Sequence, residues 1–352
     1  MAVTKRAQKH LLYISQNYSY AILRPIQEEL LKLGLEVKWF LEGEEVNSNY
    51  LKSTEFRLKS VKEVKEWKPD IVFVPGNYVP SFIPGIKVAL FHGFNSGKIR
   101  KGRIGHFDIR GCFDLYCTQG PDTTSRFKEL ANEFKYFDVK ETGWSTLDPL
   151  FKNDNSVDKD NAQPTVLFCS TFTPAISCAE EIFEPMSSIT KNKKLRWLIQ
   201  FHPKMNTDTI SKYKKLQSDN VEFIETDDVI PLLKKADIML CDTSSIISMF
   251  LLQRKPVVTF KNQSNLDHLI NINTSSDIVK SLQYGLNRPS DLMSKIDDYC
   301  NHIHPYTDGK SSLRVINAAN EIFNRQEKSK HKKPLNLIRN IKSRIKLNYW
   351  WF

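Results

Sequence analysis

The sequence predicts an α/β protein built from two Rossmann-like, doubly wound domains that face a cleft. The chain has 352 residues, and at about 150 residues per domain this length favours two domains over one. Short apolar runs alternate with helix-like segments, and the alternation occurs twice along the chain. A polar stretch separates the two series. Strand–helix alternation of this kind is typical of parallel sheets with helices on their faces.

The first series predicts an N-terminal domain over residues 1–150. A helix is expected after the first strand, with Ile22, Ile26 and Leu30 on one face and Gly34 at its end. A second helix should begin at Pro121 and Asp122. Each apolar run ends in glycine or a polar turn, as parallel strands do where they deliver loops to the sheet edge. The expected strands span residues 10–15, 35–40, 70–76, 86–93 and 114–120.

The second series predicts a C-terminal domain over residues 165–327. Residues 151–164 are polar and end in Pro164, which is typical of an interdomain linker. Ligands of such folds lie at the carboxyl ends of the strands, so both domains should present their functional residues there. The expected strands span residues 165–170, 195–203, 221–226, 236–245 and 255–260.

The cysteines and the apolar segments favour a cytoplasmic protein. Six cysteines occur without a CxxC pair or zinc-ligand spacing, and Cys169 and Cys241 fall inside strand-like runs, which indicates reduced core thiols. The first ten residues contain no apolar signal core. No segment approaches the ~20 apolar residues that a membrane-spanning helix needs. We therefore expect a chain that is neither secreted by a signal peptide nor integral to a membrane.

The positive charge is concentrated at the C-terminus. From Arg325 onward nine cations face one anion, Glu327, so this stretch holds +8 of the net +11. The near-neutral remainder disfavours a nucleic-acid-binding body. Residues 328–352 predict a basic amphipathic helix after Pro334 that ends in aromatic residues, which suits an anionic membrane surface. The alternative is a C-terminal helix packed on the N-terminal domain.

Several common functional motifs do not occur. The sequence contains neither GxGxxG nor GxxxxGK[ST], so a dinucleotide oxidoreductase or a P-loop NTPase has no support. The sequence has no HExxH motif and no DxD-like metal pair stands out, so we expect no metal ligands and no cofactor.

A histidine lies at the carboxyl end of an expected strand in each half. His92, beside Gly93 and upstream of Lys98, suits a general base that works near neutral pH. The alternative is a structural histidine that bonds a backbone carbonyl. His202 and Lys204 come directly after the apolar run LRWLIQF and can present donors and positive charge to phosphate oxygens. Here the alternative is an ordinary loop at the end of a strand.

Two hydroxyl-rich segments open helices. Asp242 ends an apolar run, and the next three residues begin a helix whose N–H groups and hydroxyls suit a phosphate. Ser312 and Arg314 open a later helix in a similar way. Ordinary helix capping uses the same residue types, so both interpretations remain open for each segment. The three residues after Asp242 are Thr243, Ser244 and Ser245.

These segments occur in an order that resembles the CDP-glycerol glycerophosphotransferase family, which includes teichoic-acid primases and polymerases. The matching segments, within residues 86–314, are HG-x4-K, GWSTLDPLF, VLFCSTFTP, FHPK, DIMLCDTSSIISMFLLQRKPVV and DGKSSLR. The resemblance implies a GT-B-like fold in which the second half binds a CDP-linked donor. The catalytic histidines of the family match His92 and His202. The chain departs from the family pattern in having Phe91 and an HGFN loop, and in having Thr243 where a tyrosine is common.

The resemblance implies a transferase that moves glycerol phosphate, or a related polyol phosphate, from a CDP donor to a hydroxyl of a polysaccharide or lipid-linked acceptor and releases CMP. His92 is the expected base, and the other residues named above are expected to bind the donor phosphates. Such a bacterial enzyme of cell-wall or capsule synthesis would lie on the inner face of the membrane. The rival interpretations are a GT-B nucleotide-sugar glycosyltransferase, a UDP-N-acetylglucosamine 2-epimerase-like enzyme, and a polyanion binder that uses the basic tail.

Overall fold

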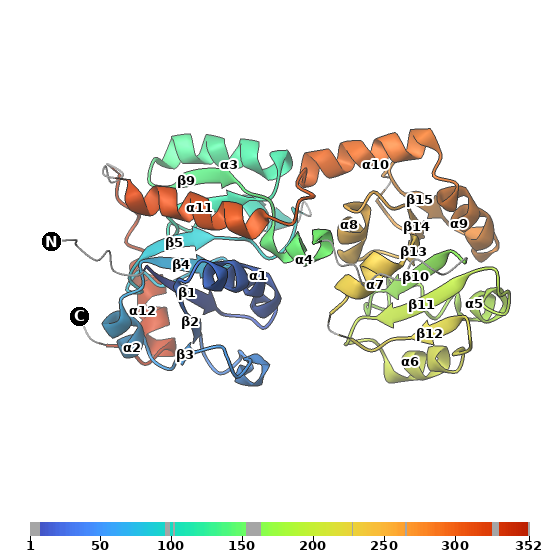
Figure 1. Cartoon of the computed structure of the whole chain (residues 1–352), viewed down its shortest axis with the longest axis horizontal. Coiled ribbons are helices and arrows are strands. Elements are labelled where there is room, and N and C mark those ends of the chain that lie inside the picture. Colours follow the sequence, from blue (N-terminus) through green and yellow to red (C-terminus); the bar gives the residue numbers. More distant parts are fainter. Residues whose placement is uncertain are drawn as a thin grey trace. The chain divides into compact units, whose positions relative to one another are not determined.

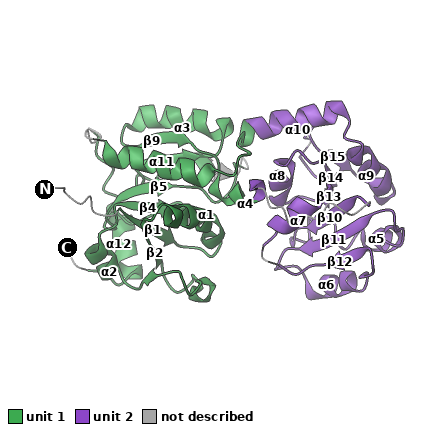
Figure 2. Ribbon diagram, viewed as in Figure 1, with its two compact units in different colours: residues 1–149, 302–352 green, residues 150–301 purple. Residues whose placement is uncertain are grey.

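The chain folds into two compact units, each of which contains its own parallel sheet (Figure 2). The structure is a computed structural model that describes residues 8–95, 99–100, 103–152, 163–226, 228–264, 266–325 and 331–350. Unit 1 comprises residues 1–149 and 302–352, and unit 2 comprises residues 150–301. Both predicted sheets are present, so the α/β class with two Rossmann-like units is confirmed.

The sheet of unit 1 has the strand order β3-β2-β1-β4-β5-β8-β9, with every neighbouring pair parallel (Figure 1). The order reverses between β1 and β4, which is where doubly wound folds bind ligands. At this point a Cβ on Gly76 would lie 2.9 Å from the hydroxyl of Ser15, so a larger residue there would require the Ser15 side chain to shift. The strands are β1 (Lys9–Ile14), β2 (Glu36–Leu41), β3 (Arg57–Leu58), β4 (Ile71–Val74), β5 (Ile86–Ala89), β8 (Leu115–Thr118) and β9 (Asp138–Glu141).

Helices from both ends of the chain cover this sheet. α1 and α11 contact each other although they lie far apart in the sequence (Figure 1). The hairpin β6 (Ile99–Arg100) and β7 (Arg103–Ile104) is antiparallel and separate from the main sheet. The helices are α1 (Ser19–Lys32), α2 (Val61–Trp67), α3 (Pro121–Phe134), α11 (Ser311–Asn324) and α12 (Leu337–Lys346), while α4 (Asp148–Phe151) runs across the boundary into unit 2.

The sheet of unit 2 has the strand order β12-β11-β10-β13-β14-β15, again all parallel. Its order reverses between β10 and β13. The strands are β10 (Thr165–Ser170), β11 (Arg196–Phe201), β12 (Val221–Phe223), β13 (Ile238–Cys241), β14 (Val257–Phe260) and β15 (Ile270–Ile272). The helices are α5 (Phe183–Ile189), α6 (Thr207–Lys214), α7 (Ile230–Lys235), α8 (Ile246–Leu251), α9 (Ile278–Leu286) and α10 (Ser290–Ile303), the last of which crosses into unit 1 at His302.

The C-terminal boundary of unit 2 differs from the prediction of a domain over residues 165–327. Residues from His302 onward belong to unit 1, because α11 buries Val315, Ile316 and Ala319 there. The backbone also comes very close: a Cβ on Gly120 would lie 2.4 Å from the carbonyl oxygen of Ile303. Most of the predicted linker, residues 153–162, lies outside the described residues.

Within the basic tail, residues Leu337–Lys346 form helix α12, which is part of unit 1. A Cβ on Gly111 would lie 2.2 Å from the ring of Pro334, so the chain preceding α12 approaches the unit 1 backbone closely. Tyr349 is 5% exposed and belongs to the core cluster that contains Leu11, Tyr13 and Val64. Across the described ranges, we find no helix with the length and apolar character that a membrane span requires.

Candidate functional site

Asp242 organises the point of unit 2 where the strand order reverses. It follows β13 and is 1% exposed. Its carboxylate accepts hydrogen bonds from the hydroxyl of Ser170 at 2.5 Å and from the backbone N–H groups of Thr171 at 3.1 Å, Cys178 at 3.1 Å and Thr243 at 2.6 Å. A carboxylate offers about four acceptor sites, and these donors occupy them. Asp242 therefore holds the loop after β10 against the start of α8, and a ligand would meet the segments that it positions.

The hydroxyls that follow Asp242 are not used for capping. Ser245 precedes α8, yet its side chain makes no capping hydrogen bond. Thr243 and Ser245 are exposed and Ser244 is half-buried. Within the described part of the chain, none of the three hydroxyls has a hydrogen bond to another residue, which leaves them open to a ligand. The described residues thus show no capping by these hydroxyls, whereas the Asp242 carboxylate does accept the backbone N–H of Thr243.

His202 and Lys204 lie at the same edge of the unit 2 sheet. Phe201, the last residue of β11, pairs with Ser170 of β10, whose hydroxyl bonds Asp242. The His202 ring packs on Phe172 with 4.5 Å between ring centroids, and the Nζ of Lys204 lies 5.8 Å from the same phenyl ring. The loop after β10 thus joins the Asp242 segment to the His202 segment through Phe172.

The imidazole of His202 is held in one neutral form. Its Nδ1 accepts a hydrogen bond from the backbone N–H of Lys204 at 3.1 Å. Partial burial lowers the pKa of His202, and the charge of Lys204 lowers it further. A neutral imidazole whose Nδ1 accepts must carry its proton on Nε2. His202 can therefore donate from Nε2 to a phosphate oxygen.

A pocket of about 380 Å³ lies beside His202, lined in part by Phe223, Glu225 and Thr226. These residues end and follow β12, the edge strand next to β11. The prediction of a strand over 221–226 located this segment, but nothing in its residue types marked it as part of a site. Its aromatic and polar side chains suit a small polar ligand with an aromatic part.

His92 lies at the carboxyl edge of the unit 1 sheet, just after β5. Its ring stacks on Tyr18 with 5.1 Å between centroids, and its Nδ1 lies 3.4 Å from the carbonyl oxygen of Pro75. A carbonyl only accepts, so Nδ1 carries the proton in this contact and Nε2 is left as the basic atom. The predicted alternative, a histidine that bonds a backbone carbonyl, is compatible with the catalytic role because the carbonyl orients the ring. His92 itself is exposed.

The segment around His92 is held by buried groups. Phe91 has a φ of +60°, which is uncommon for a residue with a side chain, and it stacks on His106 at 4.8 Å. Burial, together with the charge of His92, lowers the pKa of His106 to about 4, so His106 is neutral at physiological pH. The carbonyl of Gly93 accepts a hydrogen bond from Gln119 at 3.1 Å. Lys98 lies outside the described residues.

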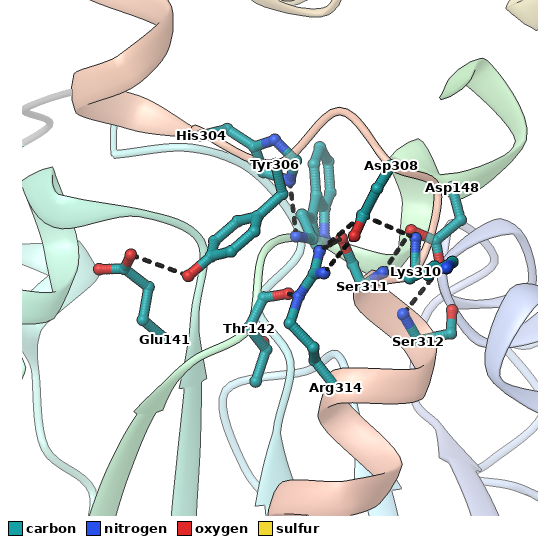
Figure 3. A network of polar contacts seen from close by, with 11 residues as sticks. Glu141, Thr142, Asp148, His304, Tyr306, Asp308, Lys310, Ser311, Ser312 and Arg314 are labelled. Carbon is teal, nitrogen blue, oxygen red and sulfur yellow. Dashed lines mark hydrogen bonds and ion pairs between the residues drawn. The ribbon is translucent and has the colours of Figure 1, made fainter. Parts of the chain in front are cut away.

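Ser312 and Arg314 belong to unit 1, where a carboxylate already occupies the start of their helix (Figure 3). Asp148 accepts hydrogen bonds from the backbone N–H groups of Ser311 at 2.8 Å and Ser312 at 2.7 Å. The Ser312 side chain is fully buried. The structure therefore favours the capping interpretation here, because the N–H groups that a phosphate would need are taken.

Arg314 is likewise engaged within unit 1. Its guanidinium pairs with Asp308 at 2.8 Å, donates to the carbonyl of Thr142 at 2.8 Å and lies 4.1 Å from the centre of the Tyr306 ring (Figure 3). Burial and the nearby Glu141 raise the pKa of Tyr306 to about 12, so its hydroxyl donates to that carboxylate. These contacts favour a structural role for Ser312 and Arg314, and their contact with donor phosphates stays a prediction.

The motifs GWSTLDP and DGKSSLR therefore meet in a structural network that the sequence analysis did not foresee. His304 is fully buried, and its Nε2 accepts a hydrogen bond from the backbone N–H of Trp144 at 2.9 Å. Gly143 has a φ of +78°, and a Cβ there would lie 2.5 Å from the Ser311 hydroxyl. Gly143, next to Trp144, was the one residue in the sequence that could have indicated how closely these two segments approach each other.

The predicted site residues thus fall into two sets. Unit 2 gathers the Asp242 segment with His202 and Lys204, and unit 1 presents His92 and Gly93. That the two sets meet at one diphosphate stays a prediction. Among the residues whose positions are described, no group of three or more histidine, cysteine or acidic side chains has an arrangement that could hold a metal ion.

Comparisons with known proteins identify the fold. No protein-family model matches the sequence, and no curated protein does. A UDP-N-acetylglucosamine 2-epimerase superposes with a TM-score of 0.60 over 94% of this chain and 100% of its own, at 16% identity. A putative UDP-N-acetylglucosamine 2-epimerase from Listeria monocytogenes gives 0.63 over 92% and 99%, at 12% identity. The wall teichoic acid polymerase TagF gives 0.63 over 91% and 90%, also at 12% identity. The chain therefore has a GT-B-like, two-domain α/β fold.

Proposed function

We propose that this protein is a transferase that moves glycerol phosphate, or a related polyol phosphate, from a CDP-linked donor to an acceptor hydroxyl and releases CMP. The observation that carries the proposal is the set of hydroxyls at Thr243–Ser245, which have no hydrogen-bond partner among the described residues and follow Asp242 at the sheet edge where the neutral His202 also lies. The motif order that resembles the glycerophosphotransferases supports the same chemistry. The likeness to TagF in fold is consistent with it.

Unit 2 binds the donor in this proposal. The hydroxyls of Thr243, Ser244 and Ser245 donate to the diphosphate oxygens, and Nε2–H of His202 donates to a further oxygen of the same diphosphate. Lys204 supplies positive charge next to His202. Hydrogen bonds to an ionised partner contribute about 1.5–3 kcal/mol each, so several such donors suffice to hold a diphosphate without a cofactor. Asp242 acts as a positioning residue, since its carboxylate is already occupied by donors of the protein.

His92 is the base of the proposed reaction. The acceptor oxygen attacks the phosphorus that bears the polyol, and Nε2 of His92 takes the hydroxyl proton. The bond from that phosphorus to the bridging oxygen breaks, and CMP leaves with the electron pair. Donors aimed at the diphosphate stabilise the charge that grows on the leaving group. The products are a phosphodiester and CMP.

The acceptor belongs to the proposal as well. A polysaccharide or a lipid-linked glycan offers the hydroxyl, and such acceptors of bacterial cell-wall or capsule synthesis are made on the inner face of the cell membrane. We therefore propose a peripheral position on that face.

A donor screen tests the proposed function. The purified protein is incubated with CDP-glycerol, CDP-ribitol and UDP-sugars, and the release of CMP or UDP is measured with product masses. CMP release that depends on an acceptor is expected with a CDP-polyol. His92→Ala should lower kcat by ~10²-fold or more, because a general base is lost, while donor binding stays close to that of the parent protein. Near-normal turnover of this variant would remove His92 from the role.

A nucleotide-sugar enzyme is the second candidate. The observation that favours it is the fold similarity to UDP-N-acetylglucosamine 2-epimerases over nearly the whole chain. The same screen separates the two: UDP release, or epimerised UDP-sugar, with no turnover of CDP-polyols would replace the transferase proposal by this one.

A further inference from the structure

Helix α12 attaches to unit 1 through its polar side chains. Asn340 accepts hydrogen bonds from the hydroxyl of Tyr78 at 3.3 Å and from the backbone N–H of Ser81 at 3.2 Å. Ser343, which is 6% exposed, donates to the Tyr78 hydroxyl at 3.1 Å. These contacts lie on one side of the helix and determine which side faces the protein.

The apolar side of α12 consequently faces away from unit 1. Ile338, Ile341 and Ile345 are 74%, 51% and 61% exposed. Their spacing places them in one stripe along the helix. Just outside the two ends of the helix, Leu335 is 75% exposed and Trp350 is 51% exposed. Amphipathic helices of globular proteins normally bury their apolar side. In α12 the polar side faces unit 1 instead, and the apolar side faces solvent.

Positive charge accompanies the stripe, and negative charge does not. Residues 331–350 contain no aspartate or glutamate. Lys332 and Lys342 are exposed. Other cations anchor the segment to unit 1 instead: Lys333 pairs with Asp114 at 2.6 Å, and Lys346 pairs with Glu45 at 3.0 Å. An exposed apolar stripe with cations beside it is complementary to an anionic lipid surface.

We propose that the outer side of α12 docks unit 1 onto a lipid bilayer rich in anionic headgroups, with the helix in the plane of the interface. The isoleucines enter the boundary between headgroups and acyl chains, and Trp350 sits at headgroup level. A second copy of the chain is a poorer occupant, because a symmetric contact through α12 would bring like charges together. This inference rests on the proposed function and deepens it by naming the surface that brings the enzyme to a lipid-borne acceptor.

Vesicle sedimentation tests the proposal. The full chain, without donor or acceptor, is mixed with vesicles of phosphatidylcholine alone or with phosphatidylglycerol. We expect binding to the anionic vesicles that weakens as salt is added. The triple variant Ile338→Ser, Ile341→Ser, Ile345→Ser should lower the partition coefficient by roughly 10-fold or more, since apolar groups no longer enter the boundary. Lys342→Ala should lower it by about 5-fold at low salt, which corresponds to one cation near the surface.

A matched control lies on α1 and its end. Leu31 and Leu33 are each 53% exposed, so Leu31→Ser, Leu33→Ser removes exposed apolar side chains elsewhere on unit 1 and should leave vesicle binding unchanged. Thermal unfolding checks that both variants fold like the parent. Equal binding of the triple variant and the parent overturns the proposal. So does a concentration-dependent dimer that the triple variant abolishes, with no vesicle binding by the parent. Because no substrate is present, these outcomes are independent of the donor screen.

Discussion

At the residue scale, Asp242 and Asp148 have corresponding roles in the two units. Each carboxylate is 1% exposed and accepts backbone N–H groups at the start of a hydroxyl-rich segment. The outcome differs because Asp148 bonds the first residues of α11 directly, whereas Asp242 leaves the hydroxyls after it without a protein partner among the described residues. Local sequence could not distinguish the two, since the partner of Ser311 lies 163 residues away.

A buried histidine makes the stability of unit 1 depend on pH. His10 in β1 is fully buried, and burial lowers its pKa to about 4. Above pH ~6.5, the ordinary pKa of histidine, it is neutral in both the folded and the unfolded chain. As the pH falls toward 4, the unfolded chain takes up a proton that the folded chain does not, so stability is lost. The loss approaches about 3 kcal/mol per molecule near pH 4.

Urea denaturation across this pH range measures the effect. Other groups titrate in the same interval, so the informative quantity is the difference between the parent and His10→Leu. The free energy of unfolding of the parent should fall more steeply between pH 6.5 and 4 than that of the variant. Parallel pH profiles would show that the folded protein protonates His10 without cost.

At the element scale, the strands were the most predictable part of the chain. Runs such as residues 165–170 coincide with strand β10 because a strand buried on both faces reads as a continuous apolar run. The loops after these strands were predicted as sites because the carboxyl edge of a parallel sheet carries ligands. The pocket residues after β12 were missed, since their chemistry comes from packing beside His202 and not from a motif.

The start of α11 carries a prediction that separates a structural from a ligand-binding role. Arg314→Ala removes the ion pair with Asp308, the bond to the carbonyl of Thr142 and the stacking on Tyr306. The loss of partners for groups that are partly buried should cost about 1–3 kcal/mol of stability. The Michaelis constant for the donor should stay within about 2-fold of the parent value, because a residue with a structural role makes no contact with the donor.

The readouts are the thermal midpoint and the Michaelis constant for the donor, measured on the same preparation. Asp148→Asn serves as the companion variant, because it weakens the cap of the same helix without touching Arg314. Both variants should be destabilised with donor affinity retained. If Arg314→Ala instead keeps the parental stability and weakens apparent donor binding by about 10-fold or more, this residue returns to the donor site.

At the scale of the whole molecule, the two sheets were predictable and the division of the chain was not. The polar stretch after residue 150 marked the first boundary, and it agrees with the start of unit 2 at Leu150. No comparable stretch in the sequence marks the second boundary, at His302, where the chain returns to unit 1. This return depends on contacts between distant segments, such as Gly120 with Ile303 and Gly143 with Ser311. An α-helix with one apolar face does not reveal which sheet it covers.

The return of the chain predicts that the two units differ in their capacity to fold from a single piece. A fragment of residues 150–301 contains the complete six-stranded sheet and its own core cluster, so it should unfold in one cooperative thermal transition.

A fragment of residues 1–149 contains all seven strands of its sheet but lacks α11 and α12. Without them Trp144 loses the His304 partner of its N–H, and the surface that Val315, Ile316 and Ala319 cover becomes exposed. Circular dichroism should therefore show no sharp transition for this fragment, and joining residues 302–352 to it through a flexible linker should restore one. A sharp transition in residues 1–149 alone would mean that the sheet is stable without the C-terminal segment, which then only packs on its surface.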